Sequence, residues 1–468
     1  LADDITIVGG NKTGIFVSHV RAGSPAELCG LKEGSELLEL ERVLFGGGSV
    51  MLSQCTAEVA HFSLQWWTEP SALKHRSNKQ AYSELCSELS ASSFVGSDSF
   101  YVRVNLNIEP HSEPPSLGVS CDDIIHVTDT RHKGKYNWRC SLVDQDTAKP
   151  LQAGTMPNYN RAQQLLLVRL RKMALEQKNF RKKVGGLLIL KSTSINIKGY
   201  NWIFPISLVF EENIDAGASG QSSRPKLPWP RFQTASPLTL SKRKLQASTQ
   251  THNGCNKMNH SPECPCVVVT QGHEEHLIPY SVVQPVHIQT KRPVIFSPSI
   301  LSRGLIERLM QPAESGLMFD TCSPEPILAS ERQDKTVFLL DSCSSDNPQG
   351  IRLQSLQEVI SQDKHCLLEL GLPSVEALLR HGIYPIVIHI RPKTKKHKKL
   401  KKFFPACGEE GMMEEVCQAE ELQLETLPLL YYTLKPGAWS CTDELLVAIR
   451  NAIHSQQGAV AWVELDRL

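Results

Sequence analysis

The stretch 292–310 has the spacing of a phosphate-binding loop set between a short apolar strand and an amphipathic helix. A working P-loop follows the pattern G-x-x-x-x-G-K-[ST], because glycines let backbone N–H groups wrap the phosphates, while the lysine and the hydroxyl contact phosphate and magnesium. In this chain the four key positions are occupied by Ser297, Ser302, Arg303 and Gly304. The spacing is kept but the chemistry is lost, which predicts a loop that transfers no phosphate.

A second charge-bearing feature is the lysine run in 393–402, which the acidic stretch 409–421 follows directly. Basic clusters attract anionic leaflets by about 1 kcal/mol per residue near the surface, so one interpretation is peripheral contact with the plasma membrane. The other is a solvated helix face, because Leu400, Phe403 and Phe404 form an apolar stripe at helical spacing. In that case the acidic stretch neutralises the lysines across a helical hairpin, as a weak regulatory latch. The candidate residues are Lys395, Lys396, Lys398, Lys399, Lys401 and Lys402.

Histidine and cysteine also gather in 252–276, although without the spacing of a zinc site. Zinc modules usually carry Cys-x2–4-Cys pairs, which close tight chelate loops. Here Cys264 and Cys266 are separated by a single proline, and His273 and His276 are one residue closer than in the His-Glu-x-x-His motif. The sequence therefore predicts no metal site and no cofactor.

Composition is that of globular material, with 468 residues, 41% hydrophobic and 21% charged, which is enough for about three domains. A net charge of +1 indicates no general affinity for nucleic acid. No apolar segment reaches the roughly 18 to 20 residues of a membrane-spanning helix. The 14 cysteines lack a disulfide framework, so we expect a reducing, cytoplasmic environment. No signal peptide precedes the first strand-like run, which favours a fragment that lacks its own N-terminus.

Residues 1–92 predict a β-rich unit with two helices. The apolar, β-branched runs at 5–8 and 15–20 are separated by a Gly-Gly-Asn turn, which predicts a hairpin. The segment 56–67 carries apolar residues at helical spacing. The ordered glycines and the Gly-Ser-Pro-Ala motif within Gly9–Gly34 resemble a PDZ domain, truncated at its N-terminus.

A PDZ domain captures a peptide C-terminus as an added strand, and a glycine-rich loop holds the peptide carboxylate. The resemblance places the candidate groove residues at Ile5, Ile7, Ala57 and His61. The carboxylate loop falls on 2–5, where two aspartates would repel a carboxylate. Peptide binding and a domain that only packs or self-associates therefore both remain open.

Residues 98–160 predict a second β-rich unit. A cleanly alternating strand is expected at 100–108, and further strands are expected at 124–127 and 138–143. Together with the closing Gly-Thr-Met-Pro-Asn segment, this pattern resembles the SH3 domain of membrane-associated guanylate kinase homologues, or MAGUK proteins. The aromatic platform that binds proline-rich peptides is replaced by Val104–Ile108, so the resemblance implies a structural SH3 domain.

A long insert splits this second unit. Residues 161–276 begin with a helical pattern at 161–177 and continue as a Ser-, Pro- and Thr-rich stretch that we expect to be mostly disordered. Such an insert resembles the hook of MAGUK proteins. The SH3 strands then resume at 277–290, so 277–283 should pair with strands more than about 100 residues earlier.

Residues 291–468 predict an α/β unit that resembles a guanylate kinase. Strands are expected at 337–340, 365–370 and 384–390, helices at 374–380 and 442–454, and a closing strand at 461–463. The fold class is therefore multidomain, with a PDZ-like unit, an SH3-like barrel split by a hook, and an α/β guanylate-kinase-like unit.

The order of these units resembles the C-terminal half of the CARMA family, the caspase-recruitment-domain MAGUK scaffolds. The stretches Asp98–Leu106, Asn158–Leu165 and Tyr384–Val387 carry the resemblance in detail. It implies a non-enzymatic scaffold in NF-kappa-B activation that self-associates. It also implies signalling adaptors and a paracaspase as partners, bound through regions upstream of this chain.

The alternative is a guanylate kinase or another nucleotide-binding enzyme. Such an enzyme needs positioned arginines to neutralise the transferred phosphoryl group. No arginine occurs in 392–449, where a kinase lid supplies them, and the Thr-Arg-x-Pro-Arg-x-Gly-Glu signature of a GMP site is missing between 310 and 365. Because functional sites, and not folds, carry function, the sequence favours a protein without enzyme activity.

Overall fold

The computed structural model describes most of the chain outside the long insert. The described residues are 3–42, 48–66, 71–110, 116–134, 137–169, 195–197, 200–202, 278–312, 316–328, 330–331, 334–340, 348–391, 410–435 and 437–464. Of the predicted insert, these ranges contain helical residues up to 169 and a pair of short strands, β10 (Ile195–Ile197) and β11 (Tyr200–Trp202). The predicted disorder of the rest of the insert lies outside the described residues.

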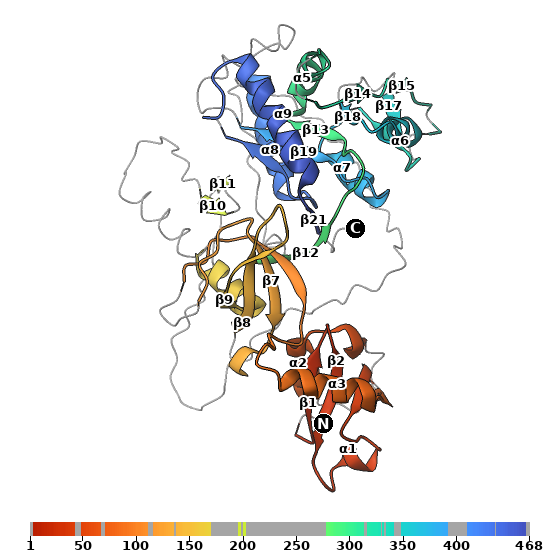
Figure 1. The fold of residues 1–468 in the computed structure, drawn as a ribbon, viewed down its shortest axis with the longest axis vertical. Coiled ribbons are helices and arrows are strands. Elements are labelled where there is room, and N and C mark those ends of the chain that lie inside the picture. Colours follow the sequence, from red (N-terminus) through yellow and green to blue (C-terminus); the bar gives the residue numbers. More distant parts are fainter. Residues whose placement is uncertain are drawn as a thin grey trace, which may run out of the picture.

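The N-terminal unit is a five-stranded antiparallel sheet with helices packed beside it (Figure 1). Ile15, Leu37 and Leu40 are fully buried in its core. The strand order is β1-β2-β3-β4, with β5 also paired to β3, so β1 lies at an edge of the sheet. Both the predicted hairpin and the predicted helix in this region are confirmed. The elements are β1 (Ile5–Gly10), β2 (Gly14–Val20), α1 (Pro25–Leu28), β3 (Ser35–Arg42), β4 (Ser49–Met51), α2 (Ala57–Trp66), β5 (Ser71–Ser77) and α3 (Lys79–Leu89).

The middle unit is a six-stranded sheet in the order β21-β12-β6-β7-β8-β9. Its strands are β6 (Phe100–Val104), β7 (Ile124–Asp129), β8 (Asn137–Val143), β9 (Pro150–Pro157), β12 (Tyr280–Val286) and β21 (Ala461–Glu464). Strand β12 pairs antiparallel with β6 and places Tyr280 opposite Val104, which confirms the predicted pairing across the insert. The strand expected at 100–108 ends at Val104, and beyond it the side chain of Asn105 donates a hydrogen bond to Ser281 Oγ of the incoming segment.

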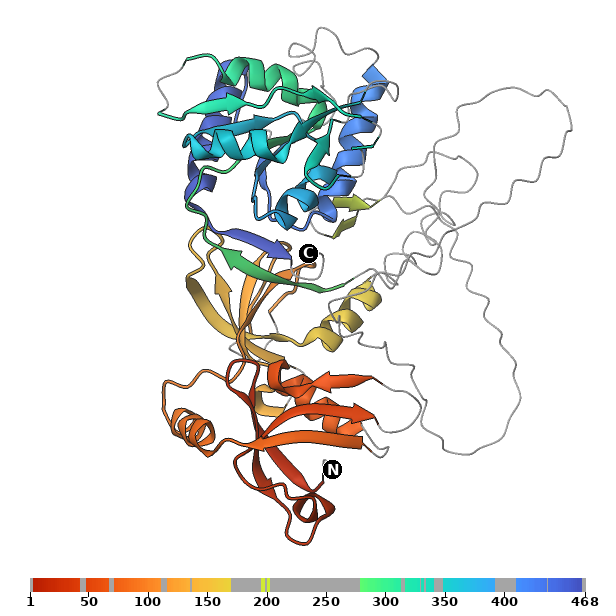
Figure 2. The same cartoon turned by 90° about the vertical axis from the view of Figure 1, so that its right-hand side faces the viewer.

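The last strand of the chain differs from the expectation. The sequence assigns 461–463 to the C-terminal α/β unit, but β21 pairs antiparallel with β12 and so closes one edge of the middle sheet. Trp462 is 1% exposed and packs with Ile124 and Val283. Figure 2 shows the dark blue and green strands side by side between the two units. The apolar composition of a strand indicates that the strand is buried, but it does not indicate which sheet the strand joins.

The C-terminal unit is built on a parallel sheet in the order β14-β18-β13-β19-β20. Val294 and Phe296 of β13 pack toward α5 and α9, whereas Ile295 packs toward α6 and α7. All residues of β13 and β19 are buried, as expected for a sheet covered on both faces. The elements are β13 (Val294–Ser297), α5 (Ser302–Leu309), β14 (Phe319–Thr321), α6 (Leu353–Ser361), β18 (His365–Leu368), α7 (Pro373–Arg380), β19 (Ile386–Ile390), α8 (Glu410–Glu425), β20 (Tyr432–Leu434) and α9 (Thr442–Gly458).

A small antiparallel sheet extends the C-terminal unit, and its strands are β15 (Glu325–Pro326), β16 (Val337–Leu339) and β17 (Gln349–Arg352). The predicted α/β character and the main strands and helices expected from the sequence are thus confirmed. Along the long axis of the molecule the N-terminal unit lies at one end, the C-terminal unit at the other, and the middle sheet between them (Figures 1 and 2).

Candidate functional site

The candidate phosphate loop, which the sequence predicts to be degenerate, connects β13 to α5. Ser297 ends β13 and Ser302 begins α5, and their side chains are buried with 0% and 1% exposure. Neither hydroxyl has a hydrogen-bond partner among the described residues. The positions that glycines occupy in a working loop thus carry buried hydroxyls, which narrow the space that a phosphate needs.

At the lysine position of the loop, Arg303 contacts a carboxylate of the same chain. The Arg303 side chain is exposed, and its Nη2 lies 2.9 Å from Oε1 of Glu369, the residue after β18. Its charge therefore faces a carboxylate. Gly304, at the hydroxyl position, is buried and offers only its carbonyl, which accepts a hydrogen bond from Arg308 at 2.7 Å. No side chain in this pair of positions is free to hold phosphate or magnesium.

The acidic stretch reaches this loop from the other side. The carboxylate of Glu420, in α8, accepts hydrogen bonds from the Ser299 N–H at 2.8 and 3.0 Å and from the Ser299 hydroxyl. Glu420 is 7% exposed. Glu420 is thus turned toward this loop in the fold, and the pairing of the acidic stretch with the lysine run stays a prediction.

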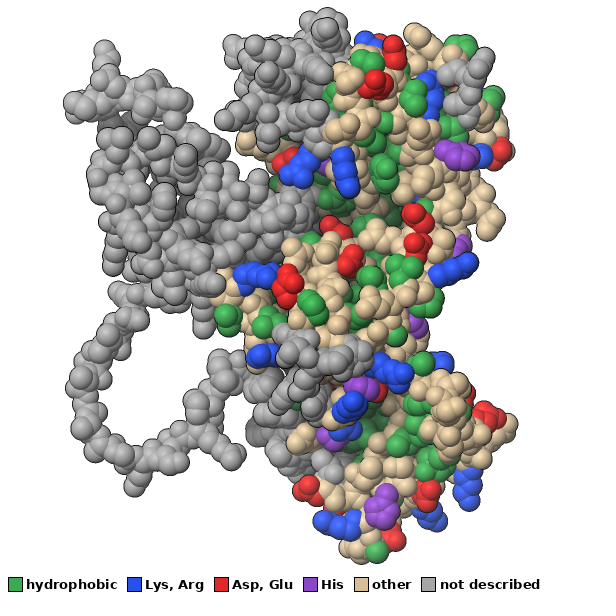
Figure 3. Space-filling view, turned by 60° about the vertical axis from the view of Figure 1, so that its left-hand side comes forward, with side chains coloured by type: hydrophobic (Ala, Val, Ile, Leu, Met, Phe, Trp, Pro, Cys, Tyr) green, Lys and Arg blue, Asp and Glu red, His purple; other side chains and the backbone are tan. Residues whose placement is uncertain are grey.

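The lysine run itself, including Lys395 to Lys402, lies outside the described residues. Both of its interpretations stay predictions. Among the described residues, basic and acidic side chains are interspersed over the face of the molecule that Figure 3 shows, and neither sign forms one dominant patch.

The candidate peptide groove of the N-terminal unit lies between the edge strand β1 and α2, which contact each other. Ile5 is buried in the core, Ile7 is half-buried, and Ala57 and His61 are half-buried on the first two turns of α2. Burial, together with the charge of Arg131, lowers the pKa of His61, which favours its neutral form. The structure thus brings these residues to one side of the sheet.

The loop before β1 should repel a carboxylate less strongly than the sequence suggests. Asp4 is buried and its Oδ1 lies 2.5 Å from Nη2 of Arg21, so that its charge is paired. Asp3 remains exposed. The expectation that both aspartates repel a carboxylate is therefore correct for at most one of them.

A carboxylate from the middle unit closes the far end of the groove. Oδ1 of Asp98 accepts hydrogen bonds from the backbone N–H of Asn11 at 3.2 Å and of Ala57 at 3.0 Å. These donors belong to the β1–β2 turn and to the start of α2. Oδ2 accepts from the N–H of Thr130 at 3.0 Å and from its hydroxyl at 2.7 Å. A Cβ added at Gly10 would clash with Asp98, so glycine is required at this crossing.

A second carboxylate, Glu58 on α2, completes this joint. Its Oε2 accepts a hydrogen bond from Nε1 of Trp138 at 2.7 Å, and its Oε1 accepts from the side-chain amide of Asn158. Its backbone N–H donates to the Thr130 hydroxyl at 2.9 Å. Burial raises the pKa of both Glu58 and Asp98, although the hydrogen bonds that each accepts oppose the shift.

Sequence reasoning missed this joint. The only relevant signal was that Asp98 and Asn158 begin stretches that carry the family resemblance. Their partners lie far along the chain: Ala57 is 41 residues from Asp98, and Asn158 is 100 residues from Glu58. No periodicity connects such pairs.

The middle and C-terminal units meet in a second joint. Arg103 of β6 forms a buried ion pair with Glu464 of β21, with side-chain exposures of 3% and 4%. Nε1 of Trp462 donates to the carbonyl of Gln145 at 2.7 Å, and the Val460 N–H donates to the carbonyl of Asp146 at 3.0 Å. The loop between β8 and β9 is thus fastened by the end of the chain.

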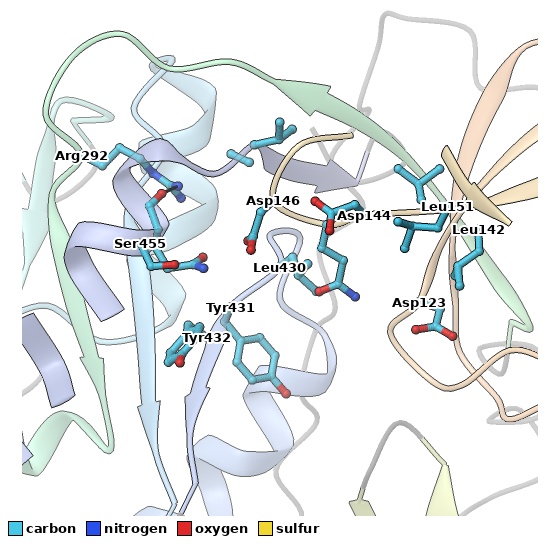
Figure 4. A pocket seen from close by; sticks show the side chains of 15 residues that line it. Asp123, Leu142, Asp144, Asp146, Leu151, Arg292, Leu430, Tyr431, Tyr432 and Ser455 are labelled. Atoms are coloured by element: carbon cyan, nitrogen blue, oxygen red, sulfur yellow. Dashed lines mark hydrogen bonds between the residues drawn. The ribbon is translucent and has the colours of Figure 1, made fainter. Parts of the chain in front are cut away.

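A cavity of about 400 Å³ lies in this joint. Figure 4 shows Arg292 and Ser455 at one end and Asp123 with leucine side chains at the other. The guanidinium of Arg292 donates to the carbonyls of Tyr384 and Pro385 at 2.9 Å, and burial lowers its pKa to about 10. Because its walls come from both units, the cavity belongs to the joint and not to the phosphate loop.

Metal and membrane features are limited to what the described ranges contain. Among these residues no group of three or more His, Cys, Asp or Glu side chains is placed to hold a metal ion. The His/Cys stretch 252–276 lies outside them. No helix within the described part of the chain is long and apolar enough to cross a bilayer.

Comparison with known proteins gave relatives over the whole chain. Caspase recruitment domain-containing protein 14 of Mus musculus is 30% identical over 469 residues, which are 99% of this chain and 42% of the relative. The Homo sapiens protein of the same name is 30% identical over 472 residues, with the same coverage. Tight junction protein ZO-3 of Mus musculus is 24% identical over 491 residues, 99% of this chain and 43% of the relative. No family model matches the chain.

A solved structure, the SH3-kinase fragment of tight junction protein 3 in apo-form, is 16% identical with a TM-score of 0.30, covering 78% of this chain and 100% of that chain. The chain spans about two fifths of the length of the curated relatives it matches. These relatives confirm the resemblance to caspase-recruitment-domain MAGUK scaffolds. They also support a MAGUK-type architecture of several units.

Proposed function

We propose that this chain, similar along nearly its whole length to caspase recruitment domain-containing protein 14, is the assembly module of a non-enzymatic MAGUK scaffold. Its units are a PDZ-like domain (1–92), an SH3-like domain (98–160 with 277–290) around a hook (161–276), and a guanylate-kinase-like domain (291–468) whose strand β21 pairs in the SH3-like sheet. The longer protein acts in NF-kappa-B activation and binds signalling adaptors and a paracaspase through regions outside this chain. It self-associates in the cytoplasm and is recruited to the plasma membrane, for which the lysine run is the candidate contact.

The observation that carries this proposal is the composition of the middle sheet. Strand β6 precedes the insert, β12 follows it and β21 ends the described chain, yet the three pair side by side. A scaffold must hold its binding surfaces at fixed separation. A sheet whose strands come from both sides of the insert supplies that rigidity at a small entropic cost, since loop closure grows only slowly with loop length.

The phosphate loop supports the non-enzymatic part of the proposal. Phosphoryl transfer depends on positioned cations and magnesium. Arg303, at the lysine position, is paired with Glu369, and the carboxylate of Glu420 occupies the N–H and hydroxyl of Ser299, so these groups of the loop are already engaged within the fold. Purified chain incubated with GMP and Mg-ATP is expected to form no GDP, and turnover above background would contradict the proposal.

The scaffold function itself is tested at the joint between the N-terminal and middle units. In the longer protein, Asp98→Ala should lower stimulated NF-kappa-B reporter output at unchanged protein level, because bound partners lose their fixed separation. Asp3→Ala, which alters an exposed aspartate of the same unit, is the matched control and should signal like the parent. Equal output from both variants would show that the rigid joint is not needed for signalling.

A further inference from the structure

The phosphate loop is filled by a side chain of its own protein. Both carboxylate oxygens of Glu420 lie within hydrogen-bond distance of the Ser299 N–H, and Oε1 also receives the Ser299 hydroxyl at 2.5 Å. Glutamate is rarely buried to this degree without partners. The carboxylate therefore lies against one backbone N–H and one hydroxyl of the loop, and backbone N–H groups are also the donors with which a P-loop holds phosphate oxygens.

The helix that carries this carboxylate is anchored on both sides of it. Cys417 and Leu424 are 6% and 1% exposed, and with Glu420 they follow the i, i+3, i+7 spacing of one helix face. Cys417 packs in the core beside α5, whereas Leu424 packs in the core on the other face of the sheet. Helix periodicity thus aims the carboxylate of Glu420 at the loop.

The hydrogen-bond donors of the loop can stabilise the single negative charge of a carboxylate better than the several charges of a polyphosphate. A polyphosphate needs a lysine and a magnesium ion in addition to backbone donors. Here Arg303 is paired with Glu369, and Ser299 gives Glu420 a neutral N–H and a neutral hydroxyl. One negative charge can be held by hydrogen bonds of this kind, as at a helix cap.

Further polar groups at the ends of the loop point to the same site. The hydroxyls of Ser297 and Ser302 and Nδ1 of His389 have no hydrogen-bond partner among the described residues, and each side chain is at least nine-tenths buried. Ser297 and His389 lie opposite each other on paired strands. Buried polar groups in native proteins are normally paired, so an unpaired set at the ends of the loop indicates that the loop is a polar site.

We propose that the former phosphate loop is a binding site for one carboxylate group, which Glu420 supplies from within the chain. The loop thereby anchors α8 to β13 and α5. A nucleotide is disfavoured because Glu420 occupies the N–H and hydroxyl of Ser299 and because Arg303, at the lysine position, is paired with Glu369. This inference does not depend on the scaffold function, since it assigns a ligand class to the loop itself.

Chemical rescue tests the proposal on the purified chain. Glu420→Ala should lower the thermal unfolding temperature by several degrees, because the loop donors lose their acceptor. Adding sodium acetate at constant ionic strength should restore part of the loss in a saturable way, since a ligand that binds the native state stabilises it by mass action. Glu421→Ala, on the next and less buried position of α8, is the control and should show neither effect.

Three results would overturn the inference. If Glu420→Ala is as stable as the parent, the contact is incidental. If pyrophosphate or Mg-ATP restores the stability of Glu420→Ala better than acetate does, the loop is a nucleotide site. If no anion restores it, Glu420 is a buried glutamate without a ligand site. If Glu420→Ala does not fold, a double-mutant cycle of Ser299→Ala and Glu420→Gln takes its place. Its unfolding temperatures should then be strongly non-additive, and additive shifts would contradict the proposal.

Discussion

Carboxylate side chains make the contacts that join the parts of this molecule. Asp98 and Glu58 connect the N-terminal unit to the middle unit, and Glu464 pairs with Arg103 where the chain end joins the middle sheet. Each acceptor is matched to donors from a distant segment. Removing one partner of such a buried group leaves the other unsatisfied, which costs more than the contact contributes.

The first prediction concerns Asp98. Changing it to alanine leaves the N–H groups of Ala57 and Thr130 without their acceptor, so the free energy of unfolding should fall by about 2 to 4 kcal/mol. Denaturant unfolding of the purified chain measures the loss. Asp3→Ala should change the free energy by less than about 0.5 kcal/mol, as exposed positions do. Equal values for the two variants would mean that Asp98 bears no part of the joint.

Acid sensitivity is the second prediction at the residue scale, and it rests on His389. Burial, with a contribution from Arg391, lowers the pKa of this side chain in β19 to about 4. Between the ordinary value of 6.5 and about 4 the unfolded chain binds a proton that the folded chain does not. Stability carried by neutral His389 is therefore complete above pH 6.5 and is lost as the pH falls, by up to about 3 kcal/mol.

Comparing the parent with His389→Leu isolates this effect from other titrating groups. The buried acids Glu58 and Asp98 have raised pKa values, so their own contribution changes with the opposite sign: it is largest at low pH and is lost as the pH rises. The difference in unfolding free energy between parent and variant should shrink or reverse between neutral pH and about pH 4. A difference that does not vary with pH would contradict the assignment.

At the scale of elements, the sequence predicts what local pattern controls. The hairpin of β1 and β2 and the buried strand β19 follow from β-branched runs bounded by turn residues. The candidate groove and loop residues were also placed correctly on their elements. What the sequence did not predict are pairings over long separations, such as Ser299 with Glu420, which are 121 residues apart. Long-range partners depend on packing, for which one sequence carries no local signal.

Strand β21 is the clearest case, and it gives the third prediction. Trp462 fills the space between the sheet and the loop of Gln145, so Trp462→Ala should cost about 3 to 5 kcal/mol of unfolding free energy. The loss should appear in the middle and C-terminal units together. Val447→Ala, on the exposed face of α9, is the control and should leave the free energy of unfolding nearly unchanged. A Trp462 variant that unfolds only the C-terminal unit would show that β21 does not belong to the middle sheet.

At the scale of the whole molecule, two segments that follow the insert, β12 and β21, add strands to the middle sheet. The segment that follows the insert enters the sheet as β12, pairs with β6 on one side and accepts β21 on the other. The N-terminal unit is then held to this sheet through Asp98 and Glu58. The described units therefore form an elongated body (Figure 1), and these joints are contacts through which a change in one unit can affect the next.

The most direct test of this account is a cut in the insert. Cleavage at an engineered protease site within 203–277 leaves one fragment that ends before β12 and another that begins with it. Because β12 supplies a middle strand of the sheet, the account predicts that both fragments elute together from a sizing column at the volume of the uncut chain and separate only in denaturant. Prompt separation into two folded fragments without denaturant would contradict it.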